Sequence, residues 1–186
     1  MALTGFLILV RILLPWVRAT GRCDVAMLGG FWFGSSFCAG LNTPIFFLDS
    51  PMKTKHELEL ADVKVIAAAA EAEALKNHWA VTIAIVDDGG HLLWLQRLDG
   101  SAASAAHIAP SKARTAAMGR RETKVFEDII NGGRTAFLSV PSIDGLLEGG
   151  VPIMKDGQCL GAVGVSGVKS TEDAQIARAG IAALGL

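Results

Sequence analysis

Two adjacent glycines, Gly149 and Gly150, lie in the segment of this sequence that is best suited to bind a ligand. The segment reads Glu-Gly-Gly-Val-Pro and runs from Glu148 to Pro152. Glycines let backbone N–H groups approach a ligand closely, and successive N–H groups form concave nests that bind carboxylate or phosphate oxygens. The segment therefore predicts an anion site, in which Glu148 acts as a base or binds a cation. The alternative interpretation is a strained turn that leads into an edge strand.

Lys112, Ser166 and Gly167 are further candidates for this site. Lys112 and Arg114 are two residues apart in a helical segment, so the two cations should point in different directions. We expect a buried Lys112 to hold an anionic group, with a surface cation as the alternative. Ser166 and Gly167 should line the same cavity or form an ordinary turn between a strand and a helix. Their segment reads Gly-Val-Ser-Gly-Val, which lacks the Gly-x-Ser-x-Gly pattern of a serine hydrolase and excludes that chemistry.

The four histidines do not predict a metal cluster. They are His56, His78, His91 and His107. No two of them are four residues apart, which is the spacing that places two histidines on one helix face around a metal ion. His91 belongs to a turn, where we expect it to be solvated.

The elements expected to position these residues alternate between helices and hairpins. Asp-Gly and Gly-Gly turns indicate the hairpins, and apolar residues at spacings of three and four indicate helices. The predicted strands are 80–86, 91–98, 150–154 and 158–166, and the predicted helices are 57–76, 101–118, 121–130 and 171–184. Pro110 should break the second helix or begin a new first turn, and Thr171 should cap the last helix. Strands that come in hairpins predict an antiparallel sheet covered by helices, an α+β fold.

The first 51 residues differ in composition from the rest of the chain. They hold six of the eight phenylalanines but five charged residues in all, and a turn-like Asp-Ser-Pro sequence ends them. We interpret 52–186 as the domain and 1–51 as an extension that results from a mis-assigned start. The alternative is a genuine signal or anchor, but Arg11 and Pro15 interrupt the apolar run before the roughly 20 residues that a spanning helix needs.

Composition and charge exclude several classes of protein. The chain has 186 residues, of which 51% are hydrophobic, and a net charge of −1. Without a basic stripe, nucleic-acid binding is not expected. Cys23, Cys38 and Cys159 form no Cys-x-x-Cys pair, which argues against a disulfide framework or a zinc cluster. We expect a cytoplasmic protein with reduced cysteines, or an exported or membrane-anchored one if the extension is genuine.

Four segments, taken together, resemble the GlcG/HbpS-like family. They are 85–92 (IVDDGGHL), 111–116 (SKARTA), 148–153 (EGGVPI) and 161–167 (GAVGVSG), the last followed by Glu172 and Asp173. The resemblance covers nearly all of 52–186. It implies a profilin-like sandwich built from a five-stranded antiparallel sheet and helices. It also implies homo-oligomers, and a role as a heme-binding protein or as an accessory protein of a glycolate or other catabolic operon.

From this resemblance we expect a module that holds heme, a related tetrapyrrole or another anionic small molecule between protomers. His78 is the candidate axial ligand to the heme iron, and His107 is the second candidate. The alternative is an enzyme in which Glu148, Lys112 and Asp99 carry out acid/base chemistry on a carboxylate or carbonyl compound. An accessory subunit with an empty pocket is the third hypothesis.

Overall fold

The computed structural model describes residues 54–186, so the predicted extension 1–51, with Cys23 and Cys38, lies outside the described residues. The elements in chain order are α2 (Leu60–Lys76), β1 (Thr82–Asp87), β2 (Leu92–Arg97), α3 (Ala105–Gly119), α4 (Thr123–Asn131), the 3-10 helix η1 (Thr135–Ser139), β3 (Gly150–Lys155), β4 (Gln158–Ser166) and α5 (Ser170–Ala182). The α-helices and strands agree in type and order with those predicted, whereas η1 lies where a loop was expected. None of the helices in this part of the chain has the length and apolar character that a bilayer-spanning segment requires.

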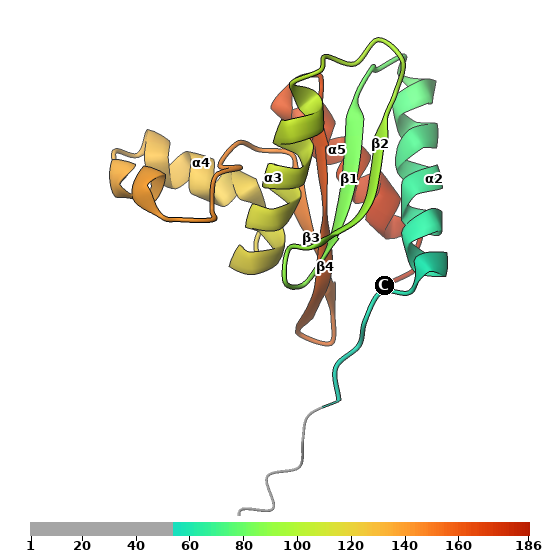
Figure 1. Cartoon of the computed structure of the whole chain (residues 1–186), viewed down its shortest axis with the longest axis horizontal. Coiled ribbons are helices and arrows are strands. Elements are labelled where there is room, and N and C mark those ends of the chain that lie inside the picture. Colours follow the sequence, from blue (N-terminus) through green and yellow to red (C-terminus); the bar gives the residue numbers. More distant parts are fainter. Residues whose placement is uncertain (1–53) are drawn as a thin grey trace, which may run out of the picture. The chain divides into compact units, whose positions relative to one another are not determined.

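The sheet has four strands in the order β2-β1-β4-β3, and every neighbouring pair is antiparallel (Figure 1). The expectation of an antiparallel sheet with helices is therefore confirmed, whereas the expectation of five strands is wrong. The described chain between the two hairpins forms α3, α4, η1 and loops, so it supplies no fifth strand. The two edges of the sheet are β2 and β3.

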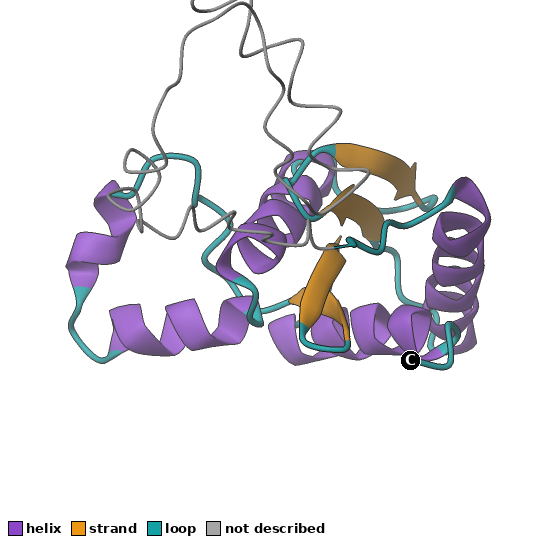
Figure 2. Ribbon diagram, turned by 90° about the horizontal axis from the view of Figure 1, so that it is seen from below, coloured by secondary structure: helices purple, strands orange, loops and turns teal. Residues whose placement is uncertain are grey.

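Helices cover both faces of the sheet (Figure 2). The two faces differ in the size of the side chains that pack there. On one face, branched side chains such as Ile83 and Ile85 pack against α2 and α5 in a large aliphatic core. On the other face, a smaller cluster composed mainly of alanines packs against α3. At Gly164 of β4, an added Cβ would overlap the carbonyl oxygen of Ala109 in α3. Small residues therefore let α3 approach the sheet closely.

Two expectations about the helix ends and the helix interior are wrong. The helix α3 continues through Pro110 without a break. Proline removes one backbone N–H donor, but Ala109 and Ala113, on either side of it, are both fully buried against the sheet and hold the two halves in line. The residue that precedes α5 is Lys169, not Thr171. The backbone N–H of Lys169 donates to Glu172 (3.1 Å), so a carboxylate in the first turn stabilises this end.

Candidate functional site

Lys112 lies inside the protein and forms an ion pair. Its side chain on α3 is 3% exposed, as is that of Asp173 in the first turn of α5. The Lys112 ammonium donates hydrogen bonds to the Asp173 carboxylate (2.8 Å) and to the backbone carbonyl of Val165 (3.0 Å). Burial raises the pKa of the Asp173 carboxyl, and the bond from Lys112 opposes that rise. The alternative of a surface cation is therefore wrong, and the Lys112 charge is balanced within the chain.

The glycine turn before β3 encloses this ion pair. Gly149 has φ +125°, a conformation that favours glycine, and an added Cβ would lie 2.7 Å from the Lys112 ammonium. The N–H of Gly150 donates to the Thr123 hydroxyl (2.9 Å). The N–H of Glu148 donates to a carboxylate oxygen of Glu127 (2.6 Å). Two donors of the predicted anion nest are thus bonded within the chain.

The other predicted contact residues lie nearby on the sheet or at its end. Ser166 is buried opposite Thr82 in the ladder between β1 and β4. Gly167 follows it, and a Cβ added there would overlap the backbone of Ala80 and Val81. Pro152 lies on β3, where an edge strand tolerates the missing N–H group. The structure thus brings Lys112 together with the glycine turn, and contact of these residues with a ligand remains a prediction.

The residues predicted as heme ligand or acid/base partner lie apart from the buried ion pair. His78 is exposed in the turn between α2 and β1, with φ +58°. His107 is exposed in the first turn of α3, and Asp99 is exposed after β2. Within residues 54–186, no three His, Cys, Asp or Glu side chains gather as they would around a metal ion. The assignment of His78 as an iron ligand stays a prediction.

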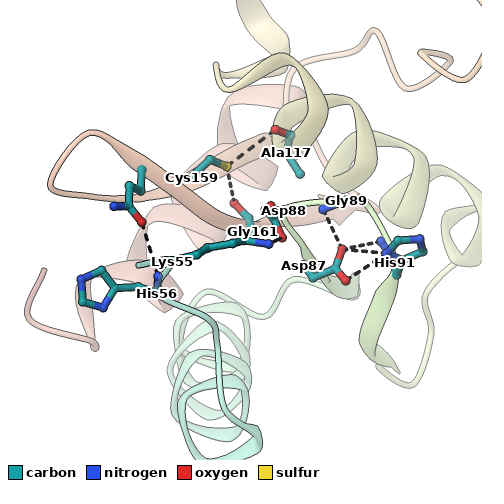
Figure 3. A network of polar contacts seen from close by, with 10 residues as sticks. Lys55, His56, Asp87, Asp88, Gly89, His91, Ala117, Cys159 and Gly161 are labelled. Carbon is teal, nitrogen blue, oxygen red and sulfur yellow. Dashed lines mark hydrogen bonds and ion pairs between the residues drawn. The ribbon is translucent and has the colours of Figure 1, made fainter. Parts of the chain in front are cut away.

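An open pocket of about 470 Å³ lies beside the turn between β1 and β2. It is lined by Gly89, Gly90, His91, Leu92, Arg114, Met118 and Ser142. Asp87 organises the turn, because one of its carboxylate oxygens accepts hydrogen bonds from the backbone N–H groups of Gly89 (2.9 Å) and His91 (2.8 Å) (Figure 3). Burial raises the Asp87 pKa, but these bonds and the imidazole of His91 outweigh that effect and hold the pKa below its usual value. Asp87 is therefore a fixed negative charge at the base of the turn.

Arg114 supplies a cation to this pocket. Its side chain is exposed on α3, and in the described part of the chain no carboxylate forms an ion pair with it. Gly90 gives it room, because a Cβ at this position (φ +82°) would lie 2.7 Å from Cγ of Arg114. Leu92 and Met118 add apolar surface to the same pocket and are 52% and 44% exposed. A guanidinium beside apolar side chains suits a ligand that is partly anionic and partly hydrophobic.

Sequence reasoning missed Arg114 as a binding residue. It correctly placed Lys112 and Arg114 on different sides of one helix, but it assigned the ligand to Lys112. The partner that neutralises Lys112 comes from α5, 61 residues later in the chain, and no local pattern shows this pairing. The Asp-Asp-Gly-Gly-His turn was visible in the sequence. Its packing against Arg114 depends on how α3 crosses the sheet.

Residues 58–182 match the family model described as "Haem degrading protein HbpS-like". The chain belongs to the HbpS-like family. Among curated proteins, it is 56% identical over 115 residues to protein GlcG of Escherichia coli strain K12, an alignment that covers 62% of this chain and 85% of GlcG. The resemblance to the GlcG/HbpS-like family is therefore confirmed.

Solved structures show the same fold. The crystal structure of Klebsiella pneumoniae protein ORFY has a TM-score of 0.67 and 28% identity, and the match covers 72% of this chain and 95% of that one. The crystal structure of a PduOC:heme complex has a TM-score of 0.61 and 27% identity, with 69% and 95% covered. One structural relative of this HbpS-like chain has thus been crystallised with heme.

Proposed function

We propose that this HbpS-like protein is a binding module for heme, a related tetrapyrrole or another anionic small molecule, at a pocket between protomers. The observation that carries the proposal is the Arg114 guanidinium, which lies without an acidic partner among the described residues beside Leu92 and Met118. The description of the family and the heme complex of PduOC support heme as the ligand.

The residues of the pocket fit the chemistry of heme. A tetrapyrrole has broad apolar faces and carries propionates at one edge, so it needs both exposed apolar side chains and a cation. Leu92 and Met118 supply the first, and Arg114 supplies the second with a planar guanidinium that can donate two hydrogen bonds to one carboxylate. When bound, heme would supply an iron centre open to redox or ligand chemistry. The protein would hold it and shield one of its faces.

A second protomer would complete the pocket. The pocket is open, and the edge strand β2 beside it exposes the apolar side chains of Leu92, Leu93 and Leu95. An edge strand with exposed apolar residues pairs readily with another chain, and contiguous apolar surface marks interaction sites. These features support a homo-oligomer in which the ligand lies between subunits.

The residues first proposed from the sequence define a second location for the anion, around Lys112, Glu148, Gly149, Gly150 and Ser166. The geometry favours the Arg114 pocket over it. Lys112 already bonds Asp173, and the N–H of Gly150 already bonds Thr123. A ligand there would have to displace buried interactions, whereas among the described residues Arg114 forms no ion pair that a ligand would have to break. The acid/base enzyme is also disfavoured, because it requires Lys112, which is already bonded to Asp173.

Hemin titration tests the proposal. Wild-type protein should bind hemin with saturation, and the Arg114→Ala protein should bind it about tenfold to a hundredfold more weakly, since a hydrogen bond to a charged group contributes roughly 1.5–3 kcal/mol. Lys64→Ala is the matched control, because Lys64 is an exposed cation on α2. Failure of the wild-type protein to bind hemin and other anionic tetrapyrroles would overturn the proposal. If the Arg114→Ala protein bound hemin with the affinity of the wild type, the ligand would bind elsewhere than in this pocket.

A further inference from the structure

His91 lies in the pocket in a geometry suited to a metal ligand. Its side chain is 81% exposed, and its Nδ1 lies 3.0 Å from a carboxylate oxygen of Asp87 (Figure 3). Because a carboxylate only accepts hydrogen bonds, Nδ1 must carry the proton that it donates. The other ring nitrogen, Nε2, has no hydrogen-bond partner among the described residues, so in the neutral imidazole its lone pair is free.

This carboxylate–histidine pair is the arrangement that commonly supports metal-binding histidines. The carboxylate fixes the tautomer, orients the ring and makes the free nitrogen a better donor to the metal. Asp87 is itself held in place, since it also accepts from the backbone N–H groups of Gly89 and His91. The turn therefore fixes the Asp87 carboxylate, and the carboxylate in turn fixes the orientation of the His91 ring.

We propose that His91 is the axial ligand to the heme iron, that Asp87 is its positioning residue, and that Arg114 pairs with a propionate of the same heme. This inference rests on the proposed heme binding. All the contacts it needs come from one pocket, because His91, Leu92, Arg114 and Met118 line it together. The expectation that His91 is exposed in a turn agrees with the structure, and the proposal adds a role for it.

Strand β1 separates His78 from this pocket. His78 precedes β1 and His91 follows it, and the six residues of the strand, at about 3.3 Å each, hold the two ends roughly 20 Å apart. An iron bound by His91 is therefore out of reach of His78 in the same protomer. This separation makes His78→Ala a matched control, since it removes an exposed imidazole from another part of the domain.

The experiment compares the Soret spectra and hemin affinities of four full-length proteins: wild type, His91→Ala, His78→Ala and His107→Ala. We expect only His91→Ala to shift the Soret maximum and to weaken binding, by about tenfold or more. Added imidazole should restore the wild-type spectrum of His91→Ala, because it replaces the missing ligand. Asp87→Asn keeps an oxygen that can accept the turn's hydrogen bonds, and it should raise the reduction potential of the bound heme by weakening the donor character of His91.

The outcomes separate the two claims. If wild-type protein binds no hemin, the proposed function fails and this inference falls with it. If wild-type protein binds hemin and His91→Ala gives the same spectrum, the proposed function stands and the ligand assignment is wrong. A shift of the Soret maximum that occurs only in His78→Ala or His107→Ala would likewise show that the assignment of His91 as the ligand is wrong. Because His91 is exposed and only its bond to Asp87 is lost, its replacement should shift the melting curve little and leave a folded domain, which circular dichroism measures.

Discussion

Replacing Lys112 with methionine should destabilise the domain strongly. The substitution keeps an unbranched side chain of similar length but leaves the Asp173 carboxylate buried without its cation. Both side chains are 3% exposed, and removing one member of a buried ion pair typically costs about 3–5 kcal/mol. We expect a decrease of that size in the free energy of unfolding at neutral pH. Denaturation by urea, followed by circular dichroism, measures it.

The loss should depend on pH in a direction set by Asp173. Burial raises the folded-state pKa of this carboxyl above its ordinary value, and Lys112→Met removes a bond that opposes the rise. A carboxyl with a higher pKa in the folded state stabilises the fold below its unfolded pKa, and this contribution disappears as the pH rises through the folded pKa. The Lys112→Met protein should therefore lose less stability near the ordinary carboxyl pKa of 3.8 than at neutral pH.

The exposed pair between Lys124 and Asp128 provides the control. These side chains are 48% and 60% exposed, so Lys124→Met should change the free energy of unfolding little, because water screens the pair. Replacing both buried partners, as in Lys112→Met with Asp173→Leu, should recover much of the lost stability, because no uncompensated charge remains. If Lys112→Met costs no more than Lys124→Met, the buried pair does not hold α3 and α5 as described.

Three other predictions concern packing, reactivity and domain boundaries. Gly164→Ala should destabilise the domain by about 1–3 kcal/mol, because the added Cβ overlaps the Ala109 carbonyl. At Gly157 an added Cβ meets no atom within 4 Å, so Gly157→Ala should cost no more than about 1–2 kcal/mol, which its positive φ accounts for. Thermal denaturation compares the two variants. Burial raises the pKa of the Cys159 thiol, so mass spectrometry after iodoacetamide treatment should find this residue modified slowly until the protein unfolds, and rapid modification of the native protein would contradict its burial. A chain that begins at Met52 should be soluble and melt cooperatively, and failure to fold would show that the predicted boundary is wrong.

Local patterns were sufficient to predict the helices and strands. The Asp-Asp-Gly-Gly turn and the Lys-Asp-Gly turn lie between paired strands as expected. Such turns could be predicted because their conformation depends on the few residues that form them. The helix α2 begins three residues later than predicted and ends at Lys76 as predicted. Pro110 misled the prediction because tertiary packing of α3 against β4 outweighs one missing hydrogen bond.

The site was harder to predict than the fold because it depends on which charges meet in space. The sequence singled out Lys112 and Gly149, and the structure does place them together. It could not show that Asp173 joins them and satisfies the cation. Arg114, two residues away on the same helix, was left unassigned because its neighbours in the pocket come from the turn between β1 and β2. Long-range pairing of this kind has no signature in spacing or composition.

A crystal structure of the protein with hemin is the most direct test of the central claim. We predict that a propionate lies within hydrogen-bond distance of the Arg114 guanidinium, that the tetrapyrrole covers Leu92 and Met118, and that a second protomer closes the open side of the pocket. A tetrapyrrole bound instead beside Lys112 and Gly149, with the bond between Lys112 and Asp173 broken, would contradict this account.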